Sequence, residues 1–305
     1  MKRSISVQFV FVLLLMALPI SALSCRSEAA AVITAVDDAS RTVYIEQTPQ
    51  RVVSLSPSIT EILFAIGLGD KVVGITEHCD YPEAAKAKPK VGGYFTTSLE
   101  DILDKDPDLI LTDGYDPVMQ QIEGLGIPML VLQPEDIDGI FKDIDLVGKV
   151  MNKEEEAARL VDSLQQRLDK VAEIKASATS SPTVFYEIDA TDPTKPWTAG
   201  PGSFADILIS LAGGSNIVTE SGSWLQLSLE KLLSANPDII ILGDYPYVTP
   251  EQVEERSGVW QDLTAVNLGK VYAVSDPSLT SRPGPRIIDG LEEIARMIHP
   301  ELFPS

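Results

Sequence analysis

The sequence predicts an α/β protein of two similar lobes, each with a mostly parallel central sheet, joined by one long helix and separated by a ligand cleft. Short apolar runs alternate with segments of helical periodicity, which is typical of parallel strands covered by helices. The stretch "YFTTSLEDILDKDPDLIL" from Tyr94 is echoed by "WLQLSLEKLLSANPDIII" from Trp224. Between the two halves, residues 141–178 combine helical periodicity with dense charge and few helix breakers.

The N-terminal segment "MKRSISVQFVFVLLLMALPISALSC" has a basic start and an apolar run that is too short for a comfortable membrane span. We therefore expect residues 1–24 to be an export signal peptide. The ending "ALSC" resembles a lipoprotein signal, so we expect a lipid on Cys25 and a tether to the membrane surface over residues 25–31. Because Ala22 stands where such signals prefer Leu, simple secretion or an uncleaved anchor is the alternative.

The N-terminal lobe is expected over residues 32–147. Two β-type runs around a polar turn predict a hairpin at its start, over residues 32–46. One helix is predicted with Ser58 or Thr60 as its N-cap, and a second with Ser98 as its N-cap. Buried strands are predicted at 51–56, 71–76, 107–112 and 128–133.

The linking helix is assigned to residues 148–178, within a helical stretch that begins near residue 141 and bends near Gly148 or Asn152. The C-terminal lobe is expected over residues 179–305. Its segment 202–218 echoes residues 58–74, as expected if the two lobes are built alike. The lobe should open with a strand at 181–188 and close with a strand at 270–275 and a helix at 284–299.

The composition argues against several classes of function. The chain has 45 acidic and 24 basic residues and a net charge of −21 at pH 7, which disfavours nucleic acid as a partner because phosphates would be repelled. The two histidines, His78 and His299, are too few for a metal site built on several imidazoles, and His299 is expected on the surface. With Cys25 lipidated, Cys79 would lack a disulfide partner. No phosphate-binding loop or nucleophile elbow is present, so we expect a binding protein rather than an enzyme, with no cofactor and no dedicated metal site.

Aromatic and charged residues occur in the loops that follow the predicted strands. In parallel α/β sheets ligands bind beyond the carboxyl ends of the strands, so these loops should line the cleft. Aromatic faces suit a large, flat, partly apolar ligand, although aromatic side chains can also simply cap the core. The candidates are His78, Tyr81, Tyr94, Asp113, Tyr115, Trp197, Trp224, Tyr245, Tyr247, Arg282 and Arg286.

The two copies of Ser-Leu-Glu place Glu100 and Glu230 near the starts of equivalent predicted helices. Acidic residues are common there because they interact favourably with the helix dipole. Their matched placement also allows each lobe to present one carboxylate to a partner with two equivalent basic sites.

Four segments resemble the substrate-binding proteins of ABC importers for cobalamin and ferric siderophores: "RVVSLSPSITEILFAIGLGDKVVGIT", "CDYPEAAKAKPKVGGY", "SLEDILDKDPDLIL" and "WTAGPGSFADILISLAGG". The resemblance extends over roughly residues 32–300, and "DYP" and "VGG" are most like the cobalamin branch. It implies two α/β lobes bridged by a rigid helix, and one glutamate per lobe that docks on arginines of a dimeric permease. Those glutamates correspond to Glu100 and Glu230.

The resemblance also implies ligand contacts. Family aromatics that touch the ligand match Tyr94 and Trp224, and a further one matches His78, which could make a polar contact or approach a metal centre. An aspartate and an arginine of the C-terminal lobe match Asp276 and Arg282. Another family tryptophan falls at Asp113, which departs from the family pattern.

We therefore expect a monomeric, lipid-anchored carrier at the outer face of the cell membrane. It would capture a corrinoid such as cobalamin and deliver it to an ABC permease dimer with its ATPase. A ferric siderophore or haem carrier is the nearest alternative, but an anionic chelate calls for convergent cations, and the loops offer mainly Arg282 and Arg286. A secreted hydrolase and a sensory or adhesive surface protein are the alternatives from other classes.

Overall fold

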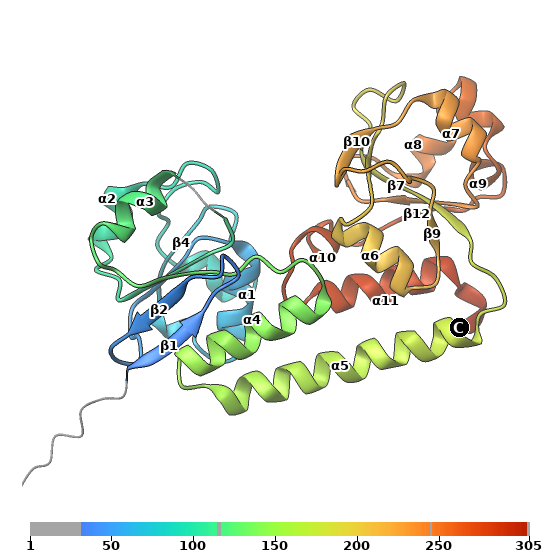
Figure 1. Cartoon of the computed structure of the whole chain (residues 1–305). Helices are drawn as coiled ribbons and strands as arrows, with labels where there is room; N and C mark the ends of the chain where they lie inside the picture. Colours follow the sequence, from blue (N-terminus) through green and yellow to red (C-terminus); the bar gives the residue numbers. More distant parts are fainter. Residues whose placement is uncertain (1–31, 115–116, 245, 304–305) are drawn as a thin grey trace, which may run out of the picture. The chain divides into compact units, whose positions relative to one another are not determined.

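The computed structural model describes residues 32–114, 117–244 and 246–303. The predicted signal peptide, Cys25, the tether to residue 31, Tyr115 and Tyr245 lie outside the described residues. Within the described part, the predicted α/β class is confirmed, because helices cover two separate sheets with parallel strands at their centres (Figure 1). No helix in that part combines the length and apolarity needed to cross a bilayer.

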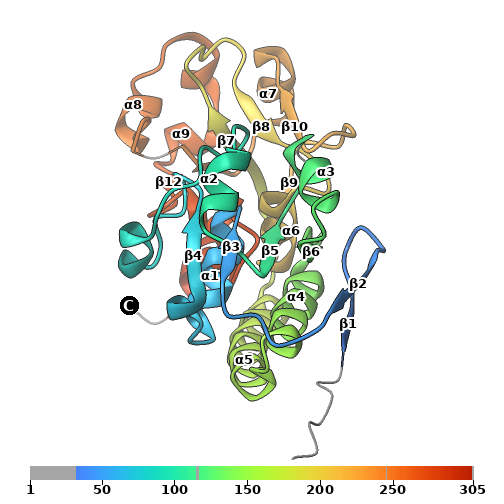
Figure 2. The ribbon, with the colours of Figure 1, turned by 90° about the vertical axis from the view of Figure 1, so that its left-hand side faces the viewer.

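The first sheet is fully parallel, with the strand order β4-β3-β5-β6 (Figure 2). Its residues are almost all buried, as expected for strands covered on both faces. The strands are β3 (Val52–Ser54), β4 (Val72–Ile75), β5 (Leu109–Thr112) and β6 (Met129–Val131). The helices around them are α1 (Pro57–Ala65), η1 (Gly69–Lys71), η2 (Glu83–Ala87), α2 (Leu99–Asp104) and α3 (Pro117–Glu123). The predicted hairpin is confirmed as the antiparallel pair β1 (Ile33–Val36) and β2 (Thr42–Ile45).

The second sheet is larger and mixed. Four of its strands are parallel, in the order β9-β7-β11-β12, and two antiparallel strands, β8 and β10, extend it beyond β7. The sequence predicted β7 and β12, and β11 is the apolar run that follows the second Pro-Asp pair of the repeated segment. It missed β8, β9 and β10, which are only two or three residues long. The strands are β7 (Thr183–Asp189), β8 (Trp197–Ala199), β9 (Ser215–Asn216), β10 (Trp224–Gln226), β11 (Ile239–Leu242) and β12 (Val271–Ala273). The helices are α6 (Phe204–Leu211), α7 (Leu229–Ala235), α8 (Pro250–Glu254), η3 (Gly258–Asp262), α9 (Thr264–Asn267), α10 (Ser278–Ser281), α11 (Ile287–Ile298) and η4 (Pro300–Leu302).

The repeated Ser-Leu-Glu segments begin their helices in the same way. Ser98 Oγ accepts a hydrogen bond from the Asp101 amide at 3.2 Å, and Ser228 Oγ accepts one from the Lys231 amide at 3.3 Å. The N-cap predicted for α1 is wrong: the helix begins at Pro57, a residue whose fixed φ suits the first helical position. Ser58 and Thr60 are therefore inside the first turns of α1 and do not cap it.

The predicted linking helix consists of two helices, α4 (Ile137–Val150) and α5 (Glu154–Ser177). The chain reverses between them at Asn152, which has a left-handed φ of 54°. Gly148 allows the two helices to pack closely, because a Cβ there would lie 2.4 Å from Cβ of Ala157. Figure 1 shows α5 running beside α4 and on toward α11, where Arg167 pairs with Asp289 and Glu292.

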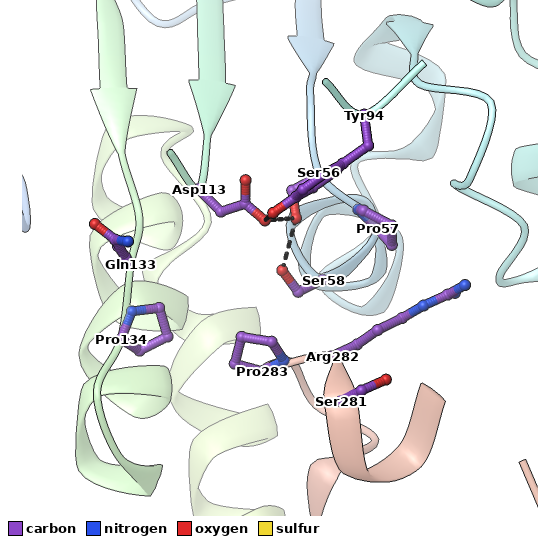
Figure 3. Close-up of a pocket in the computed structure, with 10 residues that line it drawn as sticks. All are labelled: Ser56, Pro57, Ser58, Tyr94, Asp113, Gln133, Pro134, Ser281, Arg282 and Pro283. Atoms are coloured by element: carbon purple, nitrogen blue, oxygen red, sulfur yellow. Dashed lines mark hydrogen bonds between the residues drawn. The ribbon is translucent and has the colours of Figure 1, made fainter. Parts of the chain in front are cut away.

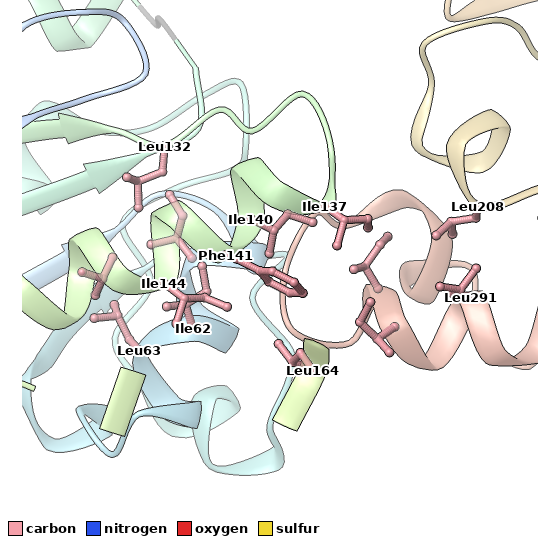
Figure 4. Packing of buried hydrophobic residues seen from close by; sticks show 14 of the residues in the cluster. Ile62, Leu63, Leu132, Ile137, Ile140, Phe141, Ile144, Leu164, Leu208 and Leu291 are labelled. Carbon is pink, nitrogen blue, oxygen red and sulfur yellow. The ribbon is translucent and has the colours of Figure 1, made fainter. Parts of the chain in front are cut away.

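One buried apolar cluster connects the helices that cover the two sheets (Figure 4). Leu63 of α1 and Ile144 of α4 belong to it, as does Leu164 of α5. Leu208 of α6 and Leu291 of α11 continue the same cluster below the second sheet. Because this core is continuous, the two halves share part of their hydrophobic stabilisation.

The burial of His299 differs from the prediction made from the sequence. It was expected on the surface, but its relative exposure is 0%. The chain turns from α11 into η4 at this residue, and Gly213 leaves the space for the ring, since a Cβ there would lie 2.9 Å from His299 Nε2.

A buried ion pair joins the first helix of the fold to the last. Glu61 of α1 is only 3% exposed, and Arg286 directly precedes α11. Arg286 Nη2 donates to Glu61 Oε1 at 2.7 Å, and Nε donates to Oε2 at 3.0 Å. Arg286 Nη1 also donates to Asp276 at 3.1 Å, and the guanidinium stacks 3.9 Å from the centre of the Tyr81 ring. This two-pronged geometry is a strong form of the Arg–carboxylate interaction.

Burial raises the pKa of the Glu61 carboxyl above its usual value, and the hydrogen bond and charge of Arg286 oppose that shift. Burial lowers the pKa of the Arg286 guanidinium, but its bonds to Glu61 and Asp276 outweigh this effect and raise the pKa overall. Each group therefore depends on the other to remain charged in the interior.

We expect Glu61→Ala to lower the free energy of unfolding by about 3–5 kcal/mol, because Arg286 would lose its buried counter-ion. The double variant Glu61→Met/Arg286→Met should recover most of that loss, since no charge is left unpaired. Urea denaturation measures both effects, with the exposed Asp70→Ala as a control that changes stability by less than about 0.5 kcal/mol. A loss below about 1 kcal/mol in Glu61→Ala would show that the pair contributes little to stability.

A second buried acid, Asp143 of α4, is only 3% exposed. Burial raises its pKa to about 8, and the neighbouring carboxyl of Asp38 in the β1–β2 turn adds to the shift. The folded state therefore binds a proton that the unfolded chain releases near its ordinary pKa of 3.8.

The contribution of Asp143 to stability should thus fall as the pH rises from about 4 to about 8. We expect Asp143→Asn to flatten this dependence and to raise the free energy of unfolding above pH 8 by on the order of 2 kcal/mol. Urea denaturation across this pH range measures it, with Asp138→Asn on the exposed side of α4 as the control. Equal pH profiles for Asp143→Asn and the unmodified chain would contradict the assignment.

Candidate ligand-binding cleft

The carboxyl ends of the first sheet open into a cavity of about 400 Å³ (Figure 3). Ser56 follows β3, Asp113 follows β5 and Gln133 follows β6, so three neighbouring strands supply one wall, to which Tyr94 is added. The opposite wall comes from the end of α10 and the segment after it, through Ser281, Arg282 and Pro283. Segments almost 170 residues apart along the chain thus line one cavity, as Asp113 and Arg282 show.

Asp113 is the polar centre of this cavity. Its Oδ2 accepts hydrogen bonds from Ser56 Oγ at 2.5 Å and from Tyr94 Oη at 2.9 Å, while its Oδ1 accepts none from the described side chains (Figure 3). Burial raises the pKa of Asp113, and the two hydroxyl donors oppose the shift. Burial and the adjacent carboxylate also raise the pKa of Tyr94, so its phenol remains a neutral donor.

A second hollow of about 480 Å³ adjoins the first, since Pro57, Tyr94 and Arg282 line both. His78 lies in this hollow, as predicted, together with Glu77. The hollow also contains Phe95, which the sequence analysis missed. Phe95 is 84% exposed, and its ring meets Tyr94 edge-on with centroids 4.6 Å apart. Its position next to Tyr94 in a Gly-rich loop was the available signal.

Four of the candidates belong to an ion network beside the cavity: Tyr81, Asp276, Arg282 and Arg286. Tyr81 stacks on Arg286, and Asp276 accepts hydrogen bonds from Arg286 and from Ser278. Arg282 Nη1 donates to Asp80 at 2.5 Å and lies 3.8 Å from Glu61. Arg282 lines the cavity, but an acid of the protein already neutralises its charge.

Two tryptophans stand on the antiparallel extension of the second sheet. Trp197 lies in β8 and Trp224 in β10, and these strands pair with each other. Their side chains are 41% and 57% exposed, which is unusual for such large apolar groups. Tyr247 in the loop after β11 is 88% exposed. All three are exposed aromatic residues of the C-terminal half.

Asp244 is a further polar group that the sequence analysis missed. It follows β11, is half-buried, and its Oδ1 is enclosed without a hydrogen-bond partner among the described residues. Burial raises the pKa of its carboxyl to about 7, and the nearby Glu187 adds to the shift. Glu187 is fully buried and is itself held by two hydrogen bonds from Arg256, at 2.6 Å and 2.9 Å.

Glu100 and Glu230 occupy equivalent positions. Each is the second residue of its helix, α2 or α7, and each is exposed. Both are therefore accessible to a partner. Across the described ranges, no group of three or more His, Cys, Asp or Glu side chains could hold a metal ion.

Comparisons with known proteins agree with this architecture. The sequence profile of the family described as periplasmic binding protein matches residues 52–277. The "Uncharacterized ABC transporter substrate-binding lipoprotein YvrC" of Bacillus subtilis is 34% identical over 278 residues, which are 88% of this chain and 86% of that protein. The "Vitamin B12-binding protein" of Yersinia pseudotuberculosis is 31% identical over 256 residues, covering 83% of this chain and 87% of that protein.

A solved structure with the same fold is named for a different ligand. The periplasmic heme-binding protein RhuT from Roseiflexus sp. RS-1 superposes with a TM-score of 0.74 at 25% sequence identity, over 83% of this chain and 99% of that one. The chain therefore belongs to the periplasmic binding protein family, as an extracytoplasmic, non-enzymatic substrate-binding protein of the ABC-importer class that includes vitamin B12 and haem binders.

Proposed function

We propose that the protein captures a corrinoid such as cobalamin and delivers it to an ABC permease dimer with its ATPase. The observation that carries this proposal is a cleft lined by Tyr94 and Phe95, in which Arg282 is already paired with Asp80 of the protein. Such a cleft suits a large, partly apolar ligand that brings no strong negative charge.

The aromatic side chains come from both halves of the chain. Tyr94 and Phe95 follow the first sheet, and Trp197, Trp224 and Tyr247 lie at the strand ends of the second. Exposed aromatic rings in soluble proteins often mark binding surfaces, because their burial by a ligand is strongly favourable. We propose that these aromatic rings contact the faces and edges of a flat macrocyclic ligand.

The charge balance separates a corrinoid from the anionic alternatives. Haem carries propionate groups, and many ferric siderophore complexes are anionic, so each would need free cations in the cleft. Arg282 is paired with Asp80, and Arg286 is paired with Glu61 and Asp276. The name of the Yersinia relative supports the corrinoid, whereas that of RhuT keeps haem as the second candidate.

We further propose that Cys25 carries a lipid that holds a monomeric carrier at the outer face of the membrane. The ending "ALSC" and the description of the Bacillus relative as a lipoprotein support this proposal. Mass spectrometry of the protein from its host tests it, since the N-terminal peptide would begin with an acylated Cys25.

We expect calorimetry to detect cyanocobalamin binding and to find much weaker binding of haemin and a ferric hydroxamate. Tyr94→Ala and Trp224→Ala should each weaken corrinoid binding about tenfold or more, because each removes an aromatic contact. Tyr44→Ala is the matched control, since Tyr44 is 65% exposed on the β1–β2 hairpin and should not affect binding. Tighter binding of haemin than of any corrinoid would refute the assignment.

We assign Glu100 and Glu230 to permease docking, because each is exposed at the same position of an equivalent helix. The double variant Glu100→Ala/Glu230→Ala should bind ligand within about twofold of the unmodified chain and lower uptake about tenfold or more, if basic groups of the permease engage both. Uptake into vesicles with the reconstituted permease and ATPase measures this. The control is Glu154→Ala/Glu173→Ala on α5, two exposed acids outside the repeated segments. Unchanged uptake in the first variant would remove the docking role.

A further inference from the structure

Two carboxyls at the ends of equivalent strands have no counter-ion among the described residues. Asp113 follows β5 and Asp244 follows β11, and each of these strands begins after a Pro-Asp pair of the repeated segment. Both strands lie inside a parallel array, so each carboxyl stands at the edge where this fold class binds ligands. The two halves therefore each place one acid at the binding edge.

Asp113 has unused acceptor capacity toward the cavity. Its two hydrogen bonds from side chains, those of Ser56 and Tyr94, both end on Oδ2. Oδ1 accepts none from the described side chains, although the residue lines the cavity. The bonds to Oδ2 hold the carboxyl in one orientation, so Oδ1 is a positioned acceptor.

Asp244 also has an oxygen that accepts no hydrogen bond from the described residues. Its Oδ1 is enclosed and has no hydrogen-bond partner in the described part of the chain. The titratable groups that face it are Glu187, Asp189 and Tyr186 of β7 and Arg256 beyond α8. Arg256 donates both of its hydrogen bonds to Glu187, and its charge only partly offsets the effect of burial on the pKa of Asp244.

A chain of contacts connects the surroundings of Asp244 to the cavity that holds Asp113. Burial raises the pKa of Tyr186 and the charge of Asp244 adds to the shift, so the two side chains are close. The Tyr186 hydroxyl lies 2.7 Å from the Thr280 hydroxyl in α10. The next residue, Ser281, lines the cavity opposite Asp113. The Tyr186–Thr280 contact thus links the surroundings of Asp244 to α10, whose last residue lines the cavity.

The basic groups of this region are already engaged. Arg282 and Arg286 pair with acids of the protein, and Lys90 donates to the backbone carbonyls of Thr76 and Cys79. Glu77 adds another acid to the hollow beside Tyr94. The region therefore has an excess of hydrogen-bond acceptors and negative charge. A ligand rimmed with carboxylates would face repulsion there, whereas one rimmed with N–H donors would satisfy the acceptors.

We propose that Asp113 and Asp244 select a ligand that presents N–H donors, such as primary amides, and no carboxylate to the two walls of the cleft. This inference rests on the proposed function and narrows it, because the corrin ring of cobalamin is rimmed with primary amides. The two aspartates are specificity determinants that act through hydrogen bonds to the ligand rim.

The first experiment compares cyanocobalamin with a monocarboxylate derivative in which one peripheral amide has been hydrolysed. The unmodified protein should bind the amide form at least about tenfold more tightly than the derivative whose acid faces either aspartate. In Asp113→Asn, the amide oxygen still accepts from Ser56 and Tyr94, so the NH₂ group takes the place of Oδ1. Binding of the amide form should fall about tenfold, and the preference for it over the acid should shrink or reverse.

The second experiment measures affinity for cyanocobalamin between about pH 6 and pH 8. The pKa of Asp244 is about 7, so its carboxylate becomes the better acceptor over this range and affinity should rise by up to about tenfold. Asp244→Asn should lack this rise. Only the difference between the two proteins is assigned to Asp244.

Asp70→Asn serves as the charge-matched control, because it removes one exposed acid near the opposite, amino end of β4. The inference is overturned if the protein binds cyanocobalamin but neither aspartate variant differs from this control and the two ligand forms bind equally. Failure of the unmodified protein to bind any corrinoid would instead reject the proposed function. Tighter binding of haemin, which carries carboxylates, would reject both the proposed function and this inference. Measured urea midpoints separate a binding defect from a folding defect in each variant.

Discussion

The buried pair of Glu61 and Arg286 is the interaction on which the arrangement of the cleft depends. It ties α1, beneath the first sheet, to the start of α11, beneath the second, across 225 residues of sequence. Tyr81 and Asp276 complete the surroundings of the same guanidinium. Because a buried charge is costly without its partner, this pair constrains where the loop between α10 and α11 can lie relative to α1. That loop supplies one wall of the cavity.

The same pairing determines the chemistry that the cleft can offer. Two arginines that could have bound an anionic ligand instead neutralise acids of the protein. The charged groups left for a ligand include the carboxylate of Asp113, and the aromatic side chains of the cleft are Tyr94 and Phe95. Under the proposed function, such a carrier recognises a large ligand by shape, aromatic contact and hydrogen-bond donors. The class of ABC-importer binding proteins to which the chain belongs contains ligands of both kinds, so the choice lies in these side chains and not in the fold.

The candidate site could be predicted only in part. Tyr94, Asp113, His78 and Arg282 do line the cavities, because they follow strands whose carboxyl ends the apolar pattern located correctly. Tyr81 and Asp276 were equally plausible, but their main contacts are with Arg286, a partner that no local pattern reveals. Asp244 and Phe95 were missed, since their significance comes from an absent partner in one case and from exposure in the other. The N-cap of α1 and the burial of His299 failed for a similar reason, because both depend on contacts formed after the chain has folded.

The sequence by itself determined the α/β class, the internal repetition and the positions of the main strands. These follow from local periodicity, from serine N-caps and from the Pro-Asp starts of buried strands, all of which act over a few residues. Only the tertiary structure decided which charges are available to a ligand. A carboxylate or a guanidinium looks the same in the sequence whether it is free or paired, and its partner here lies up to 225 residues away.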